Sequence, residues 1–248
     1  MAQVPPMQWT DDAIVLTARP QGEANAIGDL FTRGHGRQGA MVYGGQGKAK
    51  GPILQPGNGV AVTWHGKGER ALGYFDLELK RPRAAGAFAE RMTLLGLTSV
   101  TETLAACLPE GEQQTQLYDA TGVLLDLVED KTLFPIVLAK WEVGLLDALG
   151  FGLTLDRCAA TDRMLEDGAD LVFVSPKSGT AVSQAAGMPY KDKMLPLPPF
   201  LIGMGEPVRA DIAAALRMTG HFIEERLLAP AGRALPEARR QLERRLAL

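Results

Sequence analysis

A change of pattern near residue 80 constrains the fold of this chain more than any other feature of its sequence. From Asp12 to Leu79, five short β-like runs follow one another, each bounded by Gly, Pro or Asn. They read AIVLTARP, ANAIGDLFT, QGAMVYGG, GVAVTWHG and ALGYFDLELK. Five strands in so short a segment predict a small β-barrel, because a sandwich usually needs about seven.

From Gly86 onward the apolar residues recur at helical spacing. Gly150 is the expected stop of one predicted helix, which carries five apolar residues on a single face: Phe134, Leu138, Trp141, Leu145 and Leu149. A second predicted helix has Pro207 in its first turn and ends at Pro230. Its apolar positions are Val208, Ile212, Leu216, Thr219, Ile223 and Leu227.

The segment from Leu155 to Leu197 shows neither period, so we expect an irregular insert with one strand, DLVFVS. The chain is therefore predicted to be an α+β protein of two domains. Residues 1–82 form the barrel, and residues 83–248 form a helical domain that holds the insert at about 155–197.

Charge follows the same division. Residues 1–83 carry ten Lys/Arg against seven Asp/Glu, whereas residues 84–204 carry eight against sixteen. No acid occurs between Asp29 and Glu69, and this gap is rich in glycine and contains five basic residues: Arg33, Arg37, Lys48, Lys50 and Lys67. The barrel half is thus where we expect a polyanion to bind.

The glycine-rich stretch TRGHGRQGAMVYGGQGKAKG does not fit a nucleotide-binding P-loop. Lys48 is followed by Ala49 where that motif needs Ser or Thr, and Val42 stands where its first glycine belongs. Glycine-rich loops with basic residues fit nucleic-acid phosphates better, and aromatic side chains can stack on bases. The predicted DNA-binding residues are Arg33, Arg37, Lys48, Lys50, Lys67, Arg70 and Tyr43.

Two alternatives to this interpretation stay open at the level of sequence. The glycines also suit tight hairpins, and the basic residues also suit a solvated loop. Trp64, Phe75 and Tyr74 are further stacking candidates, but Trp64 and Phe75 are equally compatible with the barrel core.

The order of these features resembles the bacterial DNA-repair family RecO over nearly the whole chain. The similarity begins near Met7, so residues 1–6 are expected to be an extension. WTDDAIVLTARPQGEANAIGDLFTRGHGRQGAMVYGG is similar to the opening barrel of that family, and KWEVGLLDALGFGLTLDRC is the most specific match. LQPGN, VSPKSG and LPLPPFL also resemble family segments.

The resemblance implies an OB-fold followed by a helical body. It also implies binding of single-stranded DNA, annealing of complementary strands and help in loading the recombinase RecA onto DNA coated by single-strand-binding protein. The implied partners are RecR and the acidic C-terminal tail of that coating protein. Lys140 matches a basic position of the family, and we expect Lys140 and Trp141 to hold this tail. The alternative is that Lys140 is a surface residue and Trp141 a core residue.

Many members of the family carry four cysteines in the insert as a zinc ribbon, and this chain departs from that pattern. Cys158 occupies the first position of one pair, but Thr161 fills the second, and Ser183 and Ala186 stand near the other pair. Because structural zinc needs four N or S donors, we expect no metal and no other cofactor. Packing of LVFV against helices and proline-stiffened ends are expected to hold the insert instead.

The sequence contains no recognisable catalytic motif. It has no G-x-S-x-G and no H-E-x-x-H, and SPKSG departs from S-x-x-K by one position. We therefore expect a protein that is not an enzyme; the competing class is an OB-fold adaptor that binds protein instead of DNA. Two cysteines, no signal-peptide pattern and no run of ~18 apolar residues predict a cytoplasmic protein without a membrane anchor, and the resemblance implies that it is nucleoid-associated.

Overall fold

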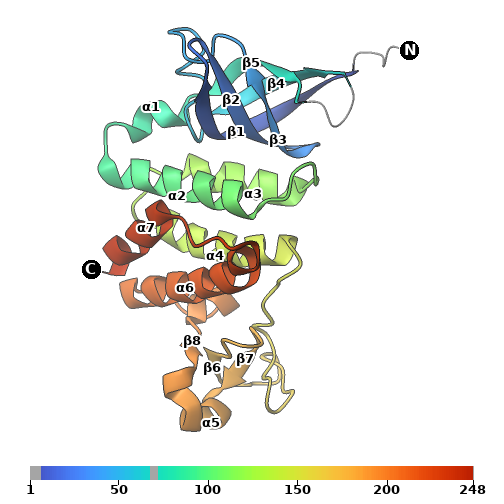
Figure 1. The fold of residues 1–248 in the computed structure, drawn as a ribbon. Coiled ribbons are helices and arrows are strands. Elements are labelled where there is room, and N and C mark those ends of the chain that lie inside the picture. The colour runs from blue at the N-terminus through green and yellow to red at the C-terminus, as the bar shows by residue number, and fades with distance from the viewer. Residues whose placement is uncertain (1–6, 68–71, 248) are drawn as a thin grey trace. The chain divides into compact units, whose positions relative to one another are not determined.

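The computed structural model describes residues 7–67 and 72–247 of the chain (Figure 1). The chain divides into two compact units, one of Met1–Glu129 with Pro236–Arg239 and one of Asp130–Leu235 with Arg240–Leu248. The predicted α+β class is confirmed, because the first unit contains a five-stranded sheet and helices follow it. The separate folding of residues 1–82 as a domain stays a prediction.

The five predicted strands are all present and close into a barrel in the order β1-β2-β3-β5-β4. This small barrel has the architecture that the resemblance to an OB-fold implied. Its strands are β1 (Met7–Gln21), β2 (Asn25–Thr32), β3 (Gly36–Val42), β4 (Gly59–Gly66) and β5 (Tyr74–Arg81).

The first strand is longer than its sequence pattern predicted, because it pairs with two neighbouring strands. Its residues 13–21 pair with β2, and its residues 7–14 pair with β4, both antiparallel. The opposite seam is short, since β3 and β5 are joined in parallel through the single pair Met41 and Tyr74.

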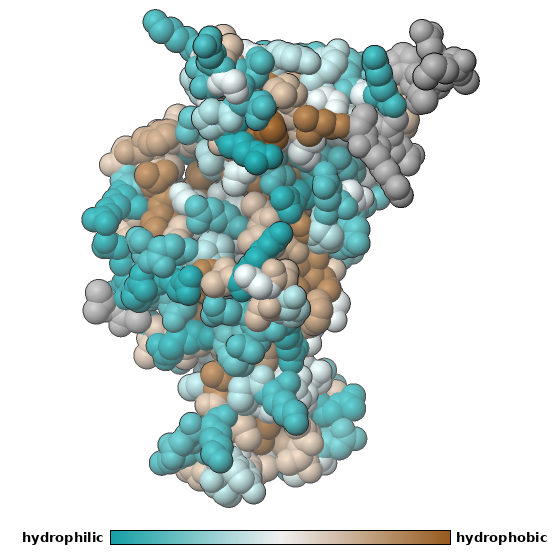
Figure 2. Space-filling model, in the orientation of Figure 1, coloured by the Kyte–Doolittle hydropathy of each residue, from teal (hydrophilic) through white to brown (hydrophobic). Residues whose placement is uncertain are grey.

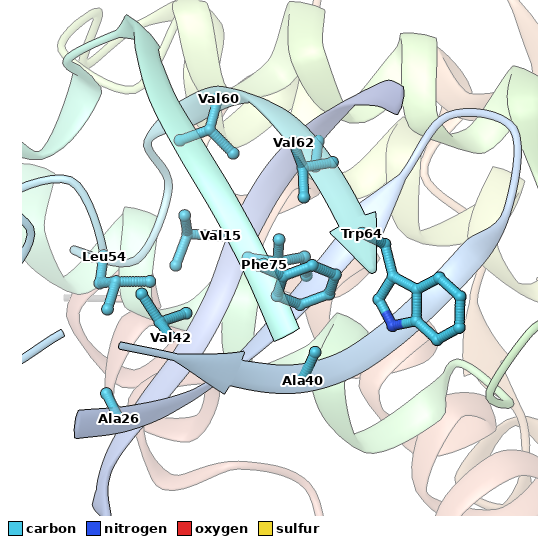
Figure 3. Close-up of a cluster of buried hydrophobic side chains, with 11 residues drawn as sticks. Val15, Ala26, Ala40, Val42, Leu54, Val60, Val62, Trp64 and Phe75 are labelled. Carbon is cyan, nitrogen blue, oxygen red and sulfur yellow. The ribbon is translucent and has the colours of Figure 1, made fainter. Parts of the chain in front are cut away.

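Apolar side chains from all five strands fill the barrel, and most of them are small or branched (Figure 3). Phe75 and Val62 are fully buried, and Trp64 is 4% exposed. Burying each such side chain contributes roughly 1.5–3 kcal/mol. The core interpretation of Trp64 and Phe75 is therefore correct.

Three helices complete the first unit: α1 (Arg83–Ala87), α2 (Arg91–Cys107) and α3 (Thr115–Asp126). Helix α2 buries Leu97, Val100 and Leu104, which lie three and four residues apart on the face that packs against β1. Helix α3 buries Leu117, Thr121, Leu124 and Leu125.

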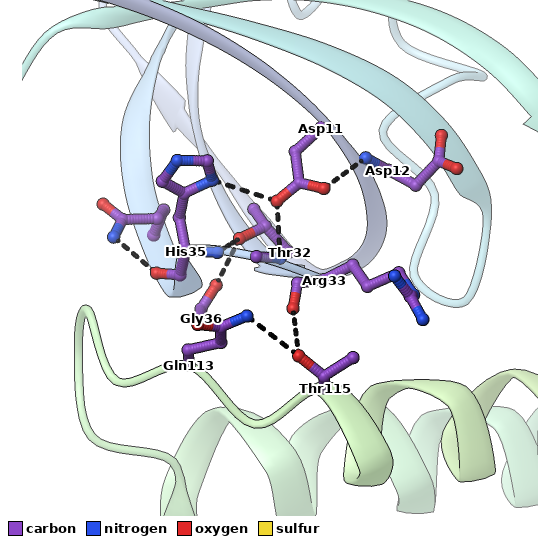
Figure 4. A network of polar contacts seen from close by, with 10 residues as sticks. Asp11, Asp12, Thr32, Arg33, His35, Gly36, Gln113 and Thr115 are labelled. Carbon is purple, nitrogen blue, oxygen red and sulfur yellow. Dashed lines mark hydrogen bonds and ion pairs between the residues drawn. The ribbon is translucent and has the colours of Figure 1, made fainter.

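The β2–β3 hairpin is fixed against the segment between α2 and α3 (Figure 4). Thr115 donates its hydroxyl to the Arg33 carbonyl at 3.2 Å, and Gly111 donates its N–H to the Arg37 carbonyl at 2.9 Å. At Gly36, which has φ +68°, a Cβ would lie 2.1 Å from the Glu112 carbonyl oxygen. Only glycine fits there, so this hairpin is held close to the helices.

The second unit is built on α4 (Leu133–Ala148) and α6 (Arg209–Phe222), which pack together. Helix α4 buries Phe134, Leu138, Trp141 and Leu145 as predicted, and Gly150 follows with φ +83°. The remaining helices are α5 (Gln184–Gly187), η1 (Met188–Lys193), η2 (Pro199–Ile202), the π-helical η3 (Ile223–Leu228), η4 (Ala229–Ala231) and α7 (Glu237–Ala247), whose first residues belong to the first unit.

The insert is more regular than its sequence suggested. It contains a three-stranded sheet in the order β7-β6-β8, formed by β6 (Leu171–Val174), β7 (Ala181–Ser183) and β8 (Leu195–Pro196). Only β6 was predicted. The other two strands are two and three residues long, and such short strands carry no periodic signal.

The predicted second helix needs two corrections. Pro207 lies before the helix rather than in its first turn, because Val208 is the N-cap and donates its N–H to Asp211 at 3.2 Å. At the other end, the π-helical turn adds a residue per turn, so that Leu228 rather than Leu227 is buried.

Candidate nucleic-acid interface

A row of cross-strand neighbours runs over the outer surface of the barrel. Arg19 pairs with Ile27, Ile27 with Met41, Met41 with Tyr74, and Tyr74 with His65. The residues that alternate with this row, such as Ala26, Val42 and Phe75, are buried inside. Because side chains alternate along a strand, the row faces outward. We call these five residues the outer row.

Aromatic rings gather at the β3–β5–β4 end of the outer row. The Tyr74 and His65 rings stack with centroids 4.6 Å apart, and Tyr43 lies 5.5 Å from Tyr74 at a tilt of 54°. Tyr43 is 57% exposed. Of the predicted stacking candidates, Tyr43 and Tyr74 thus present ring surface to solvent, whereas Trp64 and Phe75 do not.

The glycine-rich loop between β3 and β4 is ordered by hydrogen bonds rather than loosely solvated. Gln46 donates its side-chain amide to the carbonyls of Gly22 and Asn25 at 2.8 Å, and Gly44 donates its N–H to the Asn25 side chain at 3.0 Å. A Cβ at Gly45 would lie 2.7 Å from that of Ala26, so the loop approaches β2 closely. These bonds hold the start of the loop, from which Lys48 and Lys50 project, against β2.

The two loop lysines differ in their surroundings. Lys48 is exposed, and Lys50 lies 3.7 Å from the carboxylate of Asp76, which is also 3.4 Å from His65. The Asp76 side chain is largely exposed, and exposed ion pairs of this kind contribute about 0–1 kcal/mol. A phosphate can therefore compete with Asp76 for Lys50 at small cost.

The two predicted arginines of the hairpin are engaged by carboxylates. Arg33 makes a two-pronged ion pair with Asp119 of α3 at 2.9 Å, which raises the pKa of Arg33 and lowers that of Asp119. Arg37 binds Asp29 at 2.9–3.0 Å and donates to the Leu108 carbonyl at 3.1 Å. Both arginines connect the barrel to the helices of its own unit, and their contact with DNA stays a prediction.

The remaining predicted DNA-binding residues lie at the end of β4. Lys67 is exposed and follows directly after the strand. Arg70 lies outside the described residues. Arg19 and His65 of the outer row were not predicted as site residues. For His65, the alternation of Val60, Val62 and Trp64 with polar or small residues along β4 was the signal; β1 does not alternate at Arg19, so that residue becomes evident only from the strand register.

The predicted tail-binding pair belongs to helix α4. Lys140 is exposed, but Trp141 is only 5% exposed. The burial favours the core interpretation of Trp141. Next to it, the fully buried carboxylate of Glu142 accepts a hydrogen bond from the Thr219 hydroxyl. The tail-binding role of Lys140 and Trp141 stays a prediction.

Two positions of the incomplete cysteine pattern, Thr161 and Ser183, form hydrogen bonds with the Cys158 thiol. The Cys158 sulfur is 3.4 Å from Ser183 Oγ and accepts the Ser183 N–H at 3.3 Å. Burial opposes ionisation of this thiol, but hydrogen bonds from Ser183, Thr161 and the backbone outweigh it and lower the pKa of Cys158 to about 6. Among residues 7–67 and 72–247, no three His, Cys, Asp or Glu side chains group as metal ligands would.

The closed barrel and the helices after it define an OB-fold protein, and its outer surface combines aromatic rings with basic side chains. Residues 7–83 match the family model described as Recombination protein O N terminal, and residues 90–233 match Recombination protein O C terminal. The chain therefore belongs to the RecO family of DNA repair proteins.

Three relatives match this chain over almost its full length. The chain is 43% identical to the DNA repair protein RecO of Rhodospirillum centenum over 233 residues, which cover 94% of this chain and 92% of the relative. It is 43% identical to that of Roseobacter denitrificans, covering 94% and 95%. The protein of Caulobacter vibrioides is 42% identical over 97% and 98% of the two chains. None of the described helices is long and apolar enough to cross a membrane.

Proposed function

We propose that this RecO-family protein binds single-stranded DNA across the outer row of its barrel and anneals complementary strands. Phosphates lie on Lys48, Lys50 and Lys67, and bases stack on Tyr43 and Tyr74. Annealing requires that two polyanions approach each other, so neutralising phosphates while holding bases reversibly is sufficient, and no bond is made or broken. The protein acts by binding and not as an enzyme.

The observation that carries this proposal is the aromatic group of the exposed Tyr43 and the partly exposed Tyr74 and His65 beside the basic, hydrogen-bonded loop of an OB barrel. Family membership supports the wider role. In that role the protein works with RecR, meets the tail of single-strand-binding protein at Lys140, and helps load RecA onto coated DNA in the nucleoid.

A titration with salt tests the mode of binding. Fluorescence anisotropy with a labelled single strand gives log Kd against log salt, whose slope is about 0.7 per phosphate contact. If Arg33 and Arg37 keep their carboxylate partners and the three lysines bind, the slope magnitude is roughly 2; if all five cations bind, it is roughly 3.5. A slope near zero would rule out the proposed interface.

A second candidate function is that of an OB-fold adaptor that binds protein. The carboxylate partners of Arg33 and Arg37 favour it, because they reduce the positive charge offered to DNA. The same titration, repeated with duplex DNA, separates the two classes. An adaptor binds neither the labelled single strand nor the labelled duplex at low salt. The proposed function requires that the single strand binds more tightly than the duplex.

A further inference from the structure

A hollow of about 370 Å³ lies on the outer surface of β1, β2 and β3. Gly39 lines it, and apart from this glycine and its two chain neighbours no heavy atom lies within 4 Å of where a Cβ would stand at this position. The hollow exists in part because this strand residue has no side chain. Ile27 and Leu72 form apolar walls, and Leu72 is 53% exposed.

The charges around the hollow cancel. Arg19 and Arg37 line it together with Asp29 and Glu110, and Arg37 is bound to Asp29 at 2.9–3.0 Å. With two carboxylates and two guanidinium groups, the lining has no net charge to attract a phosphate. The lining thus favours a neutral group that has its own hydrogen-bond donors and acceptors and a flat apolar surface.

The hollow adjoins the aromatic group through the outer row. Arg19 and Ile27, which line the hollow, are cross-strand neighbours in the same row as Tyr74 and His65. A strand that stacks a base on Tyr74 and follows the row toward Arg19 would pass this opening. Small-ligand pockets begin at about 300 Å³, so the hollow has room for one group of that size.

We infer that the hollow accepts one unstacked nucleobase of a bound single strand, while neighbouring bases stay on Tyr74 and Tyr43. The inference rests on the proposed function and deepens it. A nucleobase is neutral, planar and rich in donors and acceptors, which matches the lining. The site then holds DNA by a base as well as by phosphates.

The test uses Gly39→Val in the full-length protein. The substitution places a β-branched side chain into the hollow without changing charge, and strands tolerate valine well. A labelled strand carries 2-aminopurine, whose fluorescence rises when it leaves its stack. We expect a rise with the wild-type protein, and its loss together with an affinity about tenfold lower in the variant, with the salt slope unchanged.

Thr63→Val, on β4 outside the hollow, is the matched control and should behave like the wild type. If Gly39→Val fails to fold, Leu72→Ser removes a wall of the hollow and gives the same readout. Equal affinity and equal fluorescence in wild type and folded variant would overturn the inference while salt-dependent binding preserved the proposed function. Absence of any binding by wild type would remove the proposed function itself.

A free nucleotide is the other source of the same chemistry. Deoxyadenosine monophosphate, titrated alone into the wild-type protein, is expected to show no saturable binding below about 1 mM, because one base supplies little affinity. Saturable binding at micromolar concentration would assign the hollow to a free nucleotide and overturn the inference about strands.

Discussion

Two regions of the barrel carry basic residues from the same acid-free stretch of sequence, and the structure uses them differently. In the β2–β3 hairpin, Arg33 and Arg37 are bound to Asp119 and Asp29. In the β3–β4 loop, Lys48 is exposed and Lys50 has only a long, solvated contact. A local lack of acids thus says little about pairing, because a partner such as Asp119 comes from a helix 86 residues away.

The largest expected effect is on stability, which a substitution in the hairpin should lower and a substitution in the loop should not. Arg37→Ala leaves Asp29 half-buried without its partner, and a hydrogen bond to a charged group contributes about 1.5–3 kcal/mol. We expect a loss of about 2 kcal/mol in the free energy of unfolding, measured by urea denaturation. Lys48→Ala is the control and should change stability by less than about 0.5 kcal/mol.

If Arg37→Ala unfolds at the same urea concentration as wild type but binds single strands much more weakly, the assignment of Arg37 to structure is wrong. The residue would then belong with the loop lysines.

The second prediction concerns DNA binding by the loop. Replacing Lys48 and Lys50 together by alanine should lower the magnitude of the salt slope by about 1.4, since each phosphate contact contributes about 0.7. Asp76→Asn provides the opposite control, because removing the charge beside Lys50 should raise affinity about twofold. An unchanged slope in the double variant would place the phosphates elsewhere.

In the second unit, Cys158 resembles the paired arginines, because its thiol is buried and hydrogen-bonded. Its pKa is lowered to about 6 in the folded protein, whereas an ordinary thiol has a pKa near 8.5. A lowered pKa adds stability that is fully present above the unfolded value and is lost as pH falls through the folded value. The stability difference between wild type and Cys158→Ala should therefore grow from pH 6 to about pH 8.5.

Thermal melts of both proteins across that range measure the difference. A gap that stays constant with pH would show that the thiol remains protonated and that its hydrogen bonds act on the neutral form.

The smallest expected effect is at the exposed Lys140. Lys140→Ala should leave stability unchanged and weaken binding of a labelled acidic peptide with an aromatic end by up to about fivefold, since exposed ion pairs contribute at most about 1 kcal/mol. Lys193→Ala, an exposed lysine of η1, is the matched control. Equal peptide affinity in both variants would remove Lys140 from the site.

Much of the barrel could be predicted from the sequence, because its strands alternate and end at Gly, Pro or Asn. The helix around Trp141 was equally clear from its spacing. The two short strands of the insert and the π-helical turn that buries Leu228 could not be predicted, since they depend on tertiary packing rather than on a repeating pattern.

The candidate site divides in the same way. The basic loop and Tyr43 could be predicted because a glycine-rich stretch without acids is visible in the local sequence. The outer row required strand register, which places Arg19 of β1 in one row with His65 and Tyr74 of the later strands β4 and β5. The pairing of Arg33 with Asp119 and of Arg37 with Asp29 could not be predicted either, because it depends on which elements pack together.

The single residue pair that joins β3 to β5 makes this seam the place where the barrel is closed by the fewest backbone contacts. The Met41 amide, which donates to the Gly73 carbonyl at 3.2 Å, should exchange its hydrogen with solvent sooner than amides inside the β1–β2 ladder. Since Tyr74 lies on that seam, a DNA strand bound over it would shield the Met41 amide from solvent and contact both β3 and β5.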